Sequence, residues 1–122
     1  MVKLFGFSSK SNNDTLVNSP LPIASDGNDL KTLHNQQWLP KLTEFKPELL
    51  FISAGFDAHF EDDMASLKFV EADYAWLTQQ LCDMVKSTGC KGIISFLEGG
   101  YNLSALGRSA VEHIRVFAEA EE

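Results

Sequence analysis

Four side chains that could ligate a metal ion or move protons fall within positions 57–63: Asp57, His59, Asp62 and Asp63. Carboxylate oxygens and imidazole nitrogens both bind divalent metals, so a metal site is one interpretation of this loop. The other is an acidic turn whose Asp side chains cap the helix that follows it. Spacing alone leaves both interpretations open. Asp57 differs from its neighbours because it comes just after an apolar run and Gly55, where we expect a rigid backbone.

A second loop, at positions 98–102, carries two glycines followed by Tyr101. Glycine lets the backbone approach a ligand closely or adopt a positive φ, which is the expected use of Gly99 and Gly100. The phenol of Tyr101 could donate a hydrogen bond to an oxyanion that develops during a reaction. The alternative interpretation of Tyr101 is a partly buried aromatic side chain beside a tight turn.

Short apolar runs at 49–53 and 93–97 precede these two loops, and glycine or proline residues flank each run. Runs of this kind predict strands of a parallel sheet that is buried on both faces. Ligands of open α/β sheets bind beyond the carboxyl ends of the strands, so both loops should open on the same edge of the sheet. Residues 16–17 predict a weaker edge strand because Pro20 and Pro22 follow them.

Helical patterns separate the predicted strands. The first pattern spans 28–45 and should kink or break at Pro40. The second spans 71–86, and the third spans 103–118 with Asn102 as its N-cap. The third helix is predicted to carry the following apolar residues on one face: Leu103, Leu106, Ala110, Ile114 and Phe117. The order of elements predicts an α/β fold in which a parallel sheet has flanking helices (βαβαβα).

Three segments, in this order along the chain, resemble the histone deacetylase superfamily: 45–59 (FKPELLFISAGFDAH), 71–78 (EADYAWLT) and 97–103 (LEGGYNL). Residues 18–22 (NSPLP) also resemble a strand segment of that family. The chain most resembles the bacterial and class II branch, which includes acetoin-utilisation proteins and acetylpolyamine amidohydrolases. The resemblance implies a partial arginase/deacetylase-like fold and a catalytic zinc.

The resemblance also implies roles for residues in the two loops. Asp57 matches an aspartate that ligates the zinc. Tyr101 matches the tyrosine that stabilises the oxyanion formed when an acetyl amide is hydrolysed. Gly99 and Gly100 match the glycine wall of the acyl channel.

The chain departs from the family pattern in ways that bear on activity. The family's zinc site has three protein ligands, and the other two, an aspartate and a histidine, lie upstream of the matching part. So does the histidine pair that activates water. Of the histidines present, His59 matches the loop pattern without an assigned chemical role, and His34 and His113 match no motif. Asp62 stands where the family often has an acidic residue, and Phe60 where a basic or polar one is commoner.

The chain therefore corresponds to roughly the C-terminal third of a catalytic domain. We expect an N-terminal extension at 1–14, the deacetylase-like segment at 15–118 and an acidic tail at 119–122. The prediction is a truncated protein that lacks deacetylase activity alone, binds zinc weakly or not at all, and acts as an oligomeric interaction module. The alternative is a zinc-dependent deacetylase or amidohydrolase that acts on acetyl-lysine or acetylpolyamine once a missing or separate N-terminal part completes it. Loss of neighbouring strands should expose apolar surface, which predicts a homo-oligomer.

Composition narrows the remaining classes. The chain has 122 residues, 44% hydrophobic and 22% charged, which is typical of one globular domain, and its formal net charge of −7 excludes binding to nucleic acid or anionic membranes through a basic field. No apolar run reaches the roughly 18 residues of a membrane span, and the N-terminus has no signal-peptide pattern, so the predicted location is cytoplasmic. Cys82 and Cys90 are expected to be buried thiols rather than a disulfide.

Overall fold

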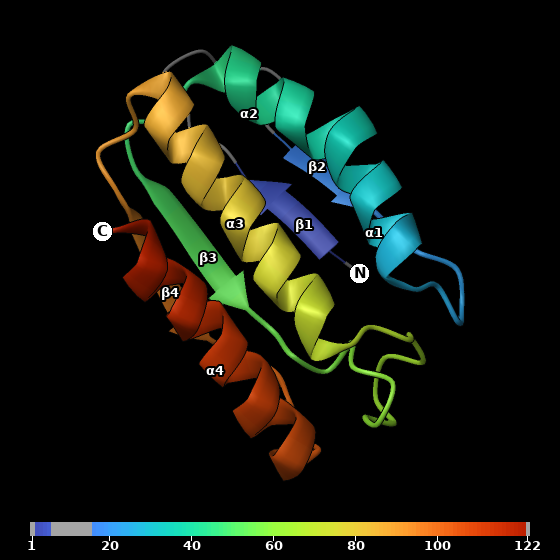
Figure 1. The fold of residues 1–122 in the computed structure, drawn as a ribbon. Helices are drawn as coiled ribbons and strands as arrows, with labels where there is room; N and C mark the ends of the chain where they lie inside the picture. Colours follow the sequence, from blue (N-terminus) through green and yellow to red (C-terminus); the bar gives the residue numbers. More distant parts are fainter. Residues whose placement is uncertain (1, 6–15, 122) are drawn as a thin grey trace.

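The computed structural model describes residues 2–5 and 16–121 as strands, helices and the loops between them. All the helices lie on the near side of the strands in Figure 1, with α3 crossing the middle of the molecule and α4 beside it. The elements are, in chain order: β1 (Val2–Phe5), β2 (Leu16–Ser19), α1 (Gly27–Leu33), η2 (His34–Trp38), α2 (Leu39–Phe45), β3 (Leu50–Ala54), α3 (Glu71–Thr88), β4 (Ile93–Leu97) and α4 (Leu103–Ala120).

The strands β3 and β4 form a parallel pair in which Leu50 lies opposite Ile93 and Ala54 lies opposite Leu97. The predicted α/β class, a parallel sheet with flanking helices, is therefore confirmed. The strand predicted at 16–17 is present as β2, but it pairs antiparallel with β1, in a sheet separate from β3 and β4. The loops that follow β3 and β4 leave the same edge of the parallel pair, which brings the two motif-bearing segments together.

The helical region predicted at 28–45 is continuous from α1 through η2 to α2. Pro40 lies in the first turn of α2, directly after η2, which is a π-helical turn. A proline ring clashes with the carbonyl of the preceding turn and lacks an N–H, and the wider π turn accommodates both defects. Here the backbone N–H of Leu39 reaches back to the carbonyl of His34, a spacing of five residues. The expected irregularity at Pro40 thus takes the form of a π turn.

The buried side chains form two adjoining clusters around α3. One cluster joins α1 and η2 to the β3 loop and includes Leu30, Phe56 and Tyr74, and the other joins α2, β3 and α3 and includes Met84. Both cysteines are buried free thiols, as predicted. Burying one apolar side chain of this size contributes about 1.5–3 kcal/mol, so the two clusters stabilise the packing of the helices against β3 and its loop.

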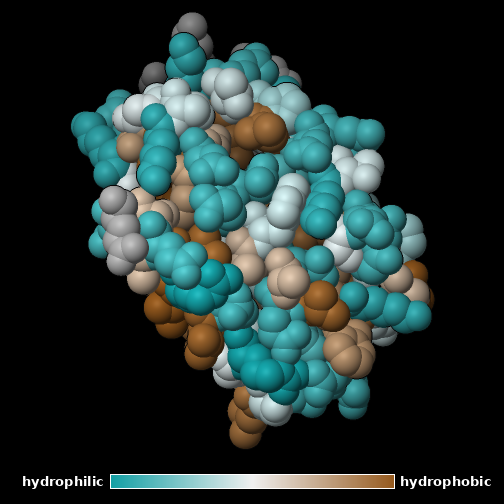
Figure 2. Space-filling view, viewed as in Figure 1, coloured by the Kyte–Doolittle hydropathy of each residue, from teal (hydrophilic) through white to brown (hydrophobic). Residues whose placement is uncertain are grey.

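The buried face of α4 differs from the prediction. Of the predicted apolar face, Leu106, Ala110 and Phe117 are half-buried, whereas Leu103 and Ile114 are exposed. The buried residues of this helix are Ala105, Ser109 and Val116. Small side chains at Ala105 and Ser109 allow α4 to lie close to its neighbours, so the apolar stripe alone gave the wrong rotation of the helix. In Figure 2 the helix-bearing face is mostly polar, with apolar side chains gathered at the lower left near α4.

Candidate functional site

Asp57 lies three residues beyond the end of β3, at the point where the two loops run side by side. The backbone N–H of Phe56 donates to the carbonyl of Gly99 (2.8 Å), and the N–H of Glu98 donates to the carbonyl of Ala54 (2.9 Å). These bonds extend the parallel ladder past the strands and hold the loops together. The carboxylate of Asp57 is half-buried against this backbone.

Glycines surround the Asp57 carboxylate. A Cβ atom at either Gly55 or Gly99 would stand only 3.0 Å from its Oδ1 atom, which is closer than ordinary van der Waals contact. The absence of side chains at these two positions therefore creates the space in which the carboxylate lies. The structure thus places Asp57 and Gly99, which the sequence put 42 positions apart, at one site.

Tyr101 follows the glycine pair and is 62% exposed, so the alternative interpretation, a partly buried aromatic residue, is wrong. Gly100 adopts φ = +141°, a conformation that side-chain-bearing residues rarely adopt. The expected use of this glycine is therefore confirmed. The predicted N-cap is also confirmed, because the Asn102 side chain accepts a hydrogen bond from the N–H of Ala105 (3.0 Å) at the start of α4.

Asp62 joins the two loops. Its Oδ2 atom accepts hydrogen bonds from the backbone N–H groups of Tyr101 (2.7 Å) and Asn102 (3.0 Å), and its Oδ1 atom accepts one from Met64 (3.0 Å). Burial alone would raise the pKa of Asp62, but these three donors and the neighbouring His59 hold the pKa below its usual value. Asp62 therefore orders its own turn through Met64, as the turn interpretation expects, but it caps no helix, and its other two bonds join it to the Tyr101 loop.

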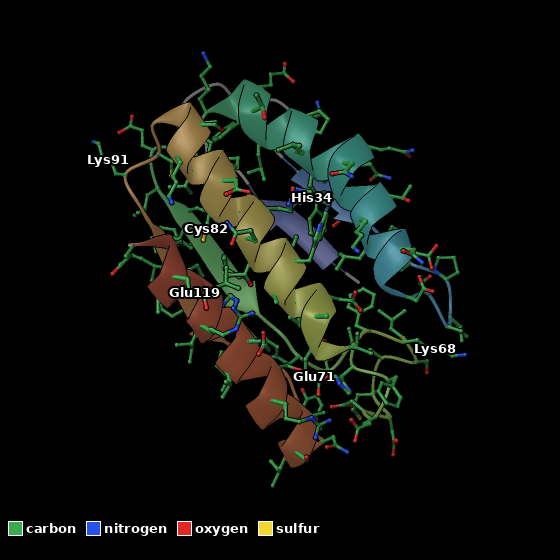
Figure 3. The ribbon with its side chains drawn as sticks, in the orientation of Figure 1. His34, Lys68, Glu71, Cys82, Lys91 and Glu119 are labelled. Atoms are coloured by element: carbon green, nitrogen blue, oxygen red, sulfur yellow. The ribbon has the colours of Figure 1, made fainter. Side chains whose placement is uncertain are left out.

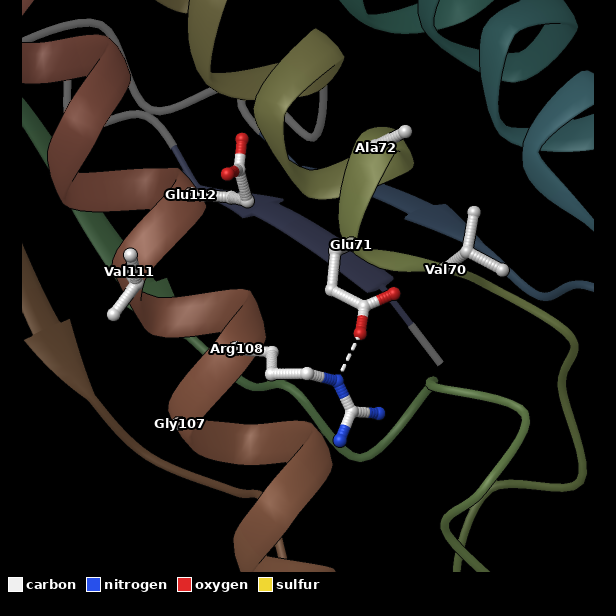
Figure 4. A pocket seen from close by; sticks show the side chains of 7 residues that line it. All are labelled: Val70, Glu71, Ala72, Gly107, Arg108, Val111 and Glu112. Atoms are coloured by element: carbon white, nitrogen blue, oxygen red, sulfur yellow. Dashed lines mark hydrogen bonds and ion pairs between the residues drawn. The ribbon is translucent and has the colours of Figure 1, made fainter.

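His59 is fully buried, and its ring nitrogens lie beside two glutamates. Its Nδ1 atom accepts a hydrogen bond from the N–H of Glu61 (3.1 Å), and its Nε2 atom lies 3.2 Å from Glu71 Oε2 at the start of α3. The guanidinium of Arg108 on α4 pairs with both Glu61 and Glu71. Figure 4 shows Arg108 and Glu71 meeting across an open groove between the starts of α3 and α4.

This ion pair perturbs Glu71. The hydrogen bond from Arg108 is the main reason that the pKa of Glu71 is lowered to about 2, with smaller contributions from its own N–H and from His59. Arg108 and its two partners were not singled out from the sequence. Arg108 on α4 is 47 positions from Glu61 and 37 from Glu71, so no local spacing connects it to them.

The four-residue metal cluster considered from the sequence does not form. Asp57 lies against the glycines, Asp62 binds backbone N–H groups, His59 faces the glutamates and Asp63 is exposed. Among the described residues, the one group of three ligand-type side chains within reach of a single ion is His59, Glu61 and Glu71. Arg108 bonds both of those glutamates and supplies the positive charge there, so this group does not fit a cation.

Asp57 does fit the role of one zinc ligand. Its carboxylate lies in a glycine-walled recess at the carboxyl end of a parallel strand, which is where ligands of such sheets bind. The described residues offer no group of three that includes Asp57, so a three-ligand zinc site that used Asp57 would need ligands from other chain segments. The ring of His113 packs edge-on against Phe56, with centroids 5.7 Å apart, but both of its nitrogens are hydrogen-bonded elsewhere, to Thr78 and Ser95. Figure 3 shows His34 well away from Glu71. No helix in the described ranges, 2–5 and 16–121, combines the length and apolarity of a membrane span.

Comparison with known proteins gives a consistent result. The histone deacetylase domain family matches residues 6–117. Type-2 histone deacetylase 1 of Dictyostelium discoideum is 42% identical over 106 residues, which cover 85% of this chain and 7% of that protein. Histone deacetylase 14, chloroplastic, of Arabidopsis thaliana is 36% identical over 101 residues, which cover 83% of this chain and 24% of that protein.

Solved structures give the same match. The crystal structure of the HDA15 HD domain superposes with a TM-score of 0.69 and 33% identity, over 78% of this chain and 26% of that one. The structure of the histone deacetylase Clr3 superposes with a TM-score of 0.67 and 31% identity, over 78% of this chain and 15% of that one.

The fold and the two loops therefore define an α/β deacetylase-like segment. The chain belongs to the histone deacetylase family, and it spans about a quarter or less of the length of these relatives.

Proposed function

We propose that this chain supplies the C-terminal part of a zinc-dependent deacetylase site, with Asp57 as one zinc ligand and Tyr101 as the oxyanion-stabilising residue. The observation that carries the proposal is the position of the Asp57 carboxylate in a recess between Gly55 and Gly99, beside the loop that presents Tyr101. The proposed substrate class is an acetylated amine, either acetyl-lysine or an acetylpolyamine. Family membership supports this class.

In a completed site, zinc would polarise the amide carbonyl and lower the pKa of a water molecule. The Asp57 carboxylate would contribute negative charge to the metal without displacing its neighbours, because Gly55 and Gly99 leave room for it. Tyr101 presents an exposed phenol at the same edge of the sheet. That phenol would donate a hydrogen bond to the oxygen on which negative charge develops.

The 122 residues alone are proposed to lack deacetylase activity and to hold zinc weakly. A single carboxylate is one ligand of the three that a catalytic zinc site uses, and the ring nitrogens of His59 are occupied by Glu61 and Glu71. A cytoplasmic location is part of the proposal, and the two free buried thiols support it because reducing compartments keep cysteines unpaired.

The decisive experiment is a chimera. Residues 16–118 replace the matching segment of the HDA15 HD domain, whose solved structure shows where to join the chains. The chimera is expected to hydrolyse an acetyl-lysine peptide. Asp57→Ala and Tyr101→Phe should each lower kcat at least 100-fold, whereas Asp63→Ala, a change at an exposed carboxylate of the same loop, should not.

A folded chimera without turnover would overturn the proposal. The isolated chain is tested in parallel by metal analysis and by the same assay. It should show substoichiometric zinc and no turnover, and tightly held stoichiometric zinc together with turnover would contradict the proposed inactivity.

A further inference from the structure

Among the residues that the structure describes, Asp62 is the one whose side chain bonds directly to the backbone of Tyr101. The two N–H groups that it binds on the second loop, those of Tyr101 and Asn102, are 39 and 40 positions away in sequence. The contact is reinforced in the other direction, because the Asn102 side chain donates to the carbonyl of Glu61 (3.0 Å). The loop that carries Asp57 and the loop that carries Tyr101 are thus joined by hydrogen bonds given in both directions, and we call this set of bonds the bridge.

Asp62 is only 5% exposed, which is unusual for a carboxylate. A buried charge costs free energy unless hydrogen bonds compensate it, and both oxygens of Asp62 are bonded to N–H groups. Only one of the three bonds, to Met64, lies within its own loop. The carboxylate therefore does more than shape a local turn, because a turn would need only the Met64 bond.

Tyr101 needs a contact that fixes its backbone because the flexible residue Gly100 precedes it. Gly100 adopts φ = +141°, and glycine has many other accessible backbone conformations. Asn102 begins α4, so the chain after Tyr101 is fixed by the helix. The position of Tyr101 is therefore set by the helix on one side and, on the other, by whatever holds its own N–H, which is Asp62.

We propose that Asp62 is a positioning residue that holds Tyr101 in place relative to Asp57. The inference rests on the proposed function only in giving Tyr101 a chemical role, and the bridge itself is a structural claim. Asp62 acts through the backbone of Tyr101 and Asn102, and it is not expected to touch substrate or metal.

The substitution that tests the bridge is Asp62→Asn. The amide keeps the size of the carboxylate but replaces one acceptor oxygen with a donor, so it cannot serve Met64 and the Tyr101–Asn102 pair together. Asp63→Asn is the matched control, because it makes the same chemical change at an exposed neighbour. Both variants are made in the 122-residue chain and measured by amide hydrogen exchange and ¹⁵N–¹H spectra.

In Asp62→Asn, the amides of Tyr101 and Asn102 should exchange at least about 10-fold faster, because a charged hydrogen bond is lost. Asp63→Asn should leave both unchanged. If only Met64 responds to Asp62→Asn, the carboxylate orders its own turn and the proposal is overturned. If Asp62→Asn does not fold, the test is made on the wild-type chain by NMR. A scalar coupling across the hydrogen bond, between the Tyr101 nitrogen and the Asp62 carboxyl carbon, is expected. Its absence would contradict the bridge.

A kinetic measurement separates positioning from general stability. In an active chimera, Asp62→Asn should lower kcat about 10- to 100-fold with KM changed less than about twofold, since a displaced Tyr101 affects the transition state. If the substitution only reduced the amount of folded enzyme, total activity would fall in proportion to the folded fraction and kcat per folded molecule would be unchanged. That result would overturn the positioning role. An inactive chimera with the bridge intact in the isolated chain would count against the proposed function alone.

Discussion

The carboxylate of Asp57 lies directly against the backbone of Gly99. A Cβ atom at Gly99 would stand 3.0 Å from Oδ1 and 3.1 Å from Cγ of Asp57, so any side chain there competes with the carboxylate for space. The glycine of the second loop thus determines where the proposed metal ligand of the first loop can lie.

Gly99→Ala is therefore expected to displace the Asp57 carboxylate by a few tenths of an ångström. In the active chimera this should lower kcat/KM about 10-fold, because misplaced catalytic groups lose transition-state stabilisation. The control is Gly107→Ala, since a Cβ at this α4 position meets nothing within 4 Å. That change should leave activity alone and raise the free energy of unfolding by about 0.5–1 kcal/mol, as for an ordinary helical glycine. Equal activity of both variants would contradict the role of Gly99.

Part of the site around Asp57 could be predicted from local sequence. The apolar run before Gly55 predicted the strand, and the strand rule then placed Asp57 and Tyr101 on one edge, which the structure confirms. The cap at Asn102 was also predictable, because capping depends on a residue and the three that follow it.

Contacts between distant segments were not predictable in this way. The bond from Asp62 to the Tyr101 backbone spans 39 positions, and the Arg108–Glu61 pair spans 47. Nothing in the spacing of the acidic loop indicated which carboxylate faces the glycines and which faces backbone donors. The rotation of α4 was missed because Ser109, a polar residue, is fully buried while Leu103 is exposed.

The Arg108–Glu71 pair predicts a specific acid sensitivity. The pKa of Glu71 is about 2 in the folded chain, mainly because of Arg108, and returns to its ordinary value near 4.5 on unfolding. A carboxylate with a depressed folded pKa contributes stability above the unfolded pKa, so this contribution is lost as the pH falls from about 4.5 to about 2. Urea unfolding of Glu71→Gln should show lower stability at pH 7 and a flatter decline over that range.

The matched control is Glu44→Gln, since Glu44 is an exposed carboxylate whose partner Lys41 lies 4.0 Å away. Its decline with acid should follow that of the wild-type chain. The assignment to the Arg108 pair fails if Glu71→Gln and the wild-type chain lose stability in parallel between pH 4.5 and 2.

His113 predicts a second pH effect, at higher pH. Thr78 Oγ1 donates to the carbonyl of Tyr74 (2.6 Å), so it must accept from His113 Nδ1 (2.7 Å), and Ser95 Oγ then donates to His113 Nε2 (2.8 Å). This network requires the neutral ring with its proton on Nδ1. Burial lowers the pKa of His113, and also that of His34.

Both histidines therefore take up protons at lower pH in the folded chain than in the unfolded chain, where the ordinary pKa is 6.5. Stability present at pH 7 should decline as the pH falls below about 6.5. His113→Phe should cost about 1–3 kcal/mol at pH 7, because it leaves Thr78 and Ser95 without this partner, and should reduce the decline. Imidazole ¹⁵N spectra showing a proton on Nε2 at neutral pH would contradict the network.

The outer face of the parallel pair predicts self-association. Phe51 and Phe96 stack on this face with ring centroids 6.1 Å apart, and they are 60% and 52% exposed. Ile94, opposite Phe51 in the register, is exposed beside them. The helices lie on the opposite side of the strands in Figure 1, so no helix of the described chain covers these rings. We propose that the same face of a second copy covers these rings in solution. In a purified sample, that face is the apolar surface available to bury them, and a symmetric dimer pairs identical surfaces.

Phe96→Asp places a charge in the centre of that face and, in a symmetric contact, opposite a second copy of itself. Sedimentation velocity should show a concentration-dependent dimer for the wild-type chain and a monomer for Phe96→Asp at the same micromolar concentrations. Ile23→Asp is the control, because Ile23 is an exposed apolar residue on a loop outside the sheet, and it should leave the dimer intact. A wild-type monomer throughout this range would refute self-association, and a dimer that survives Phe96→Asp would place the contact on another face.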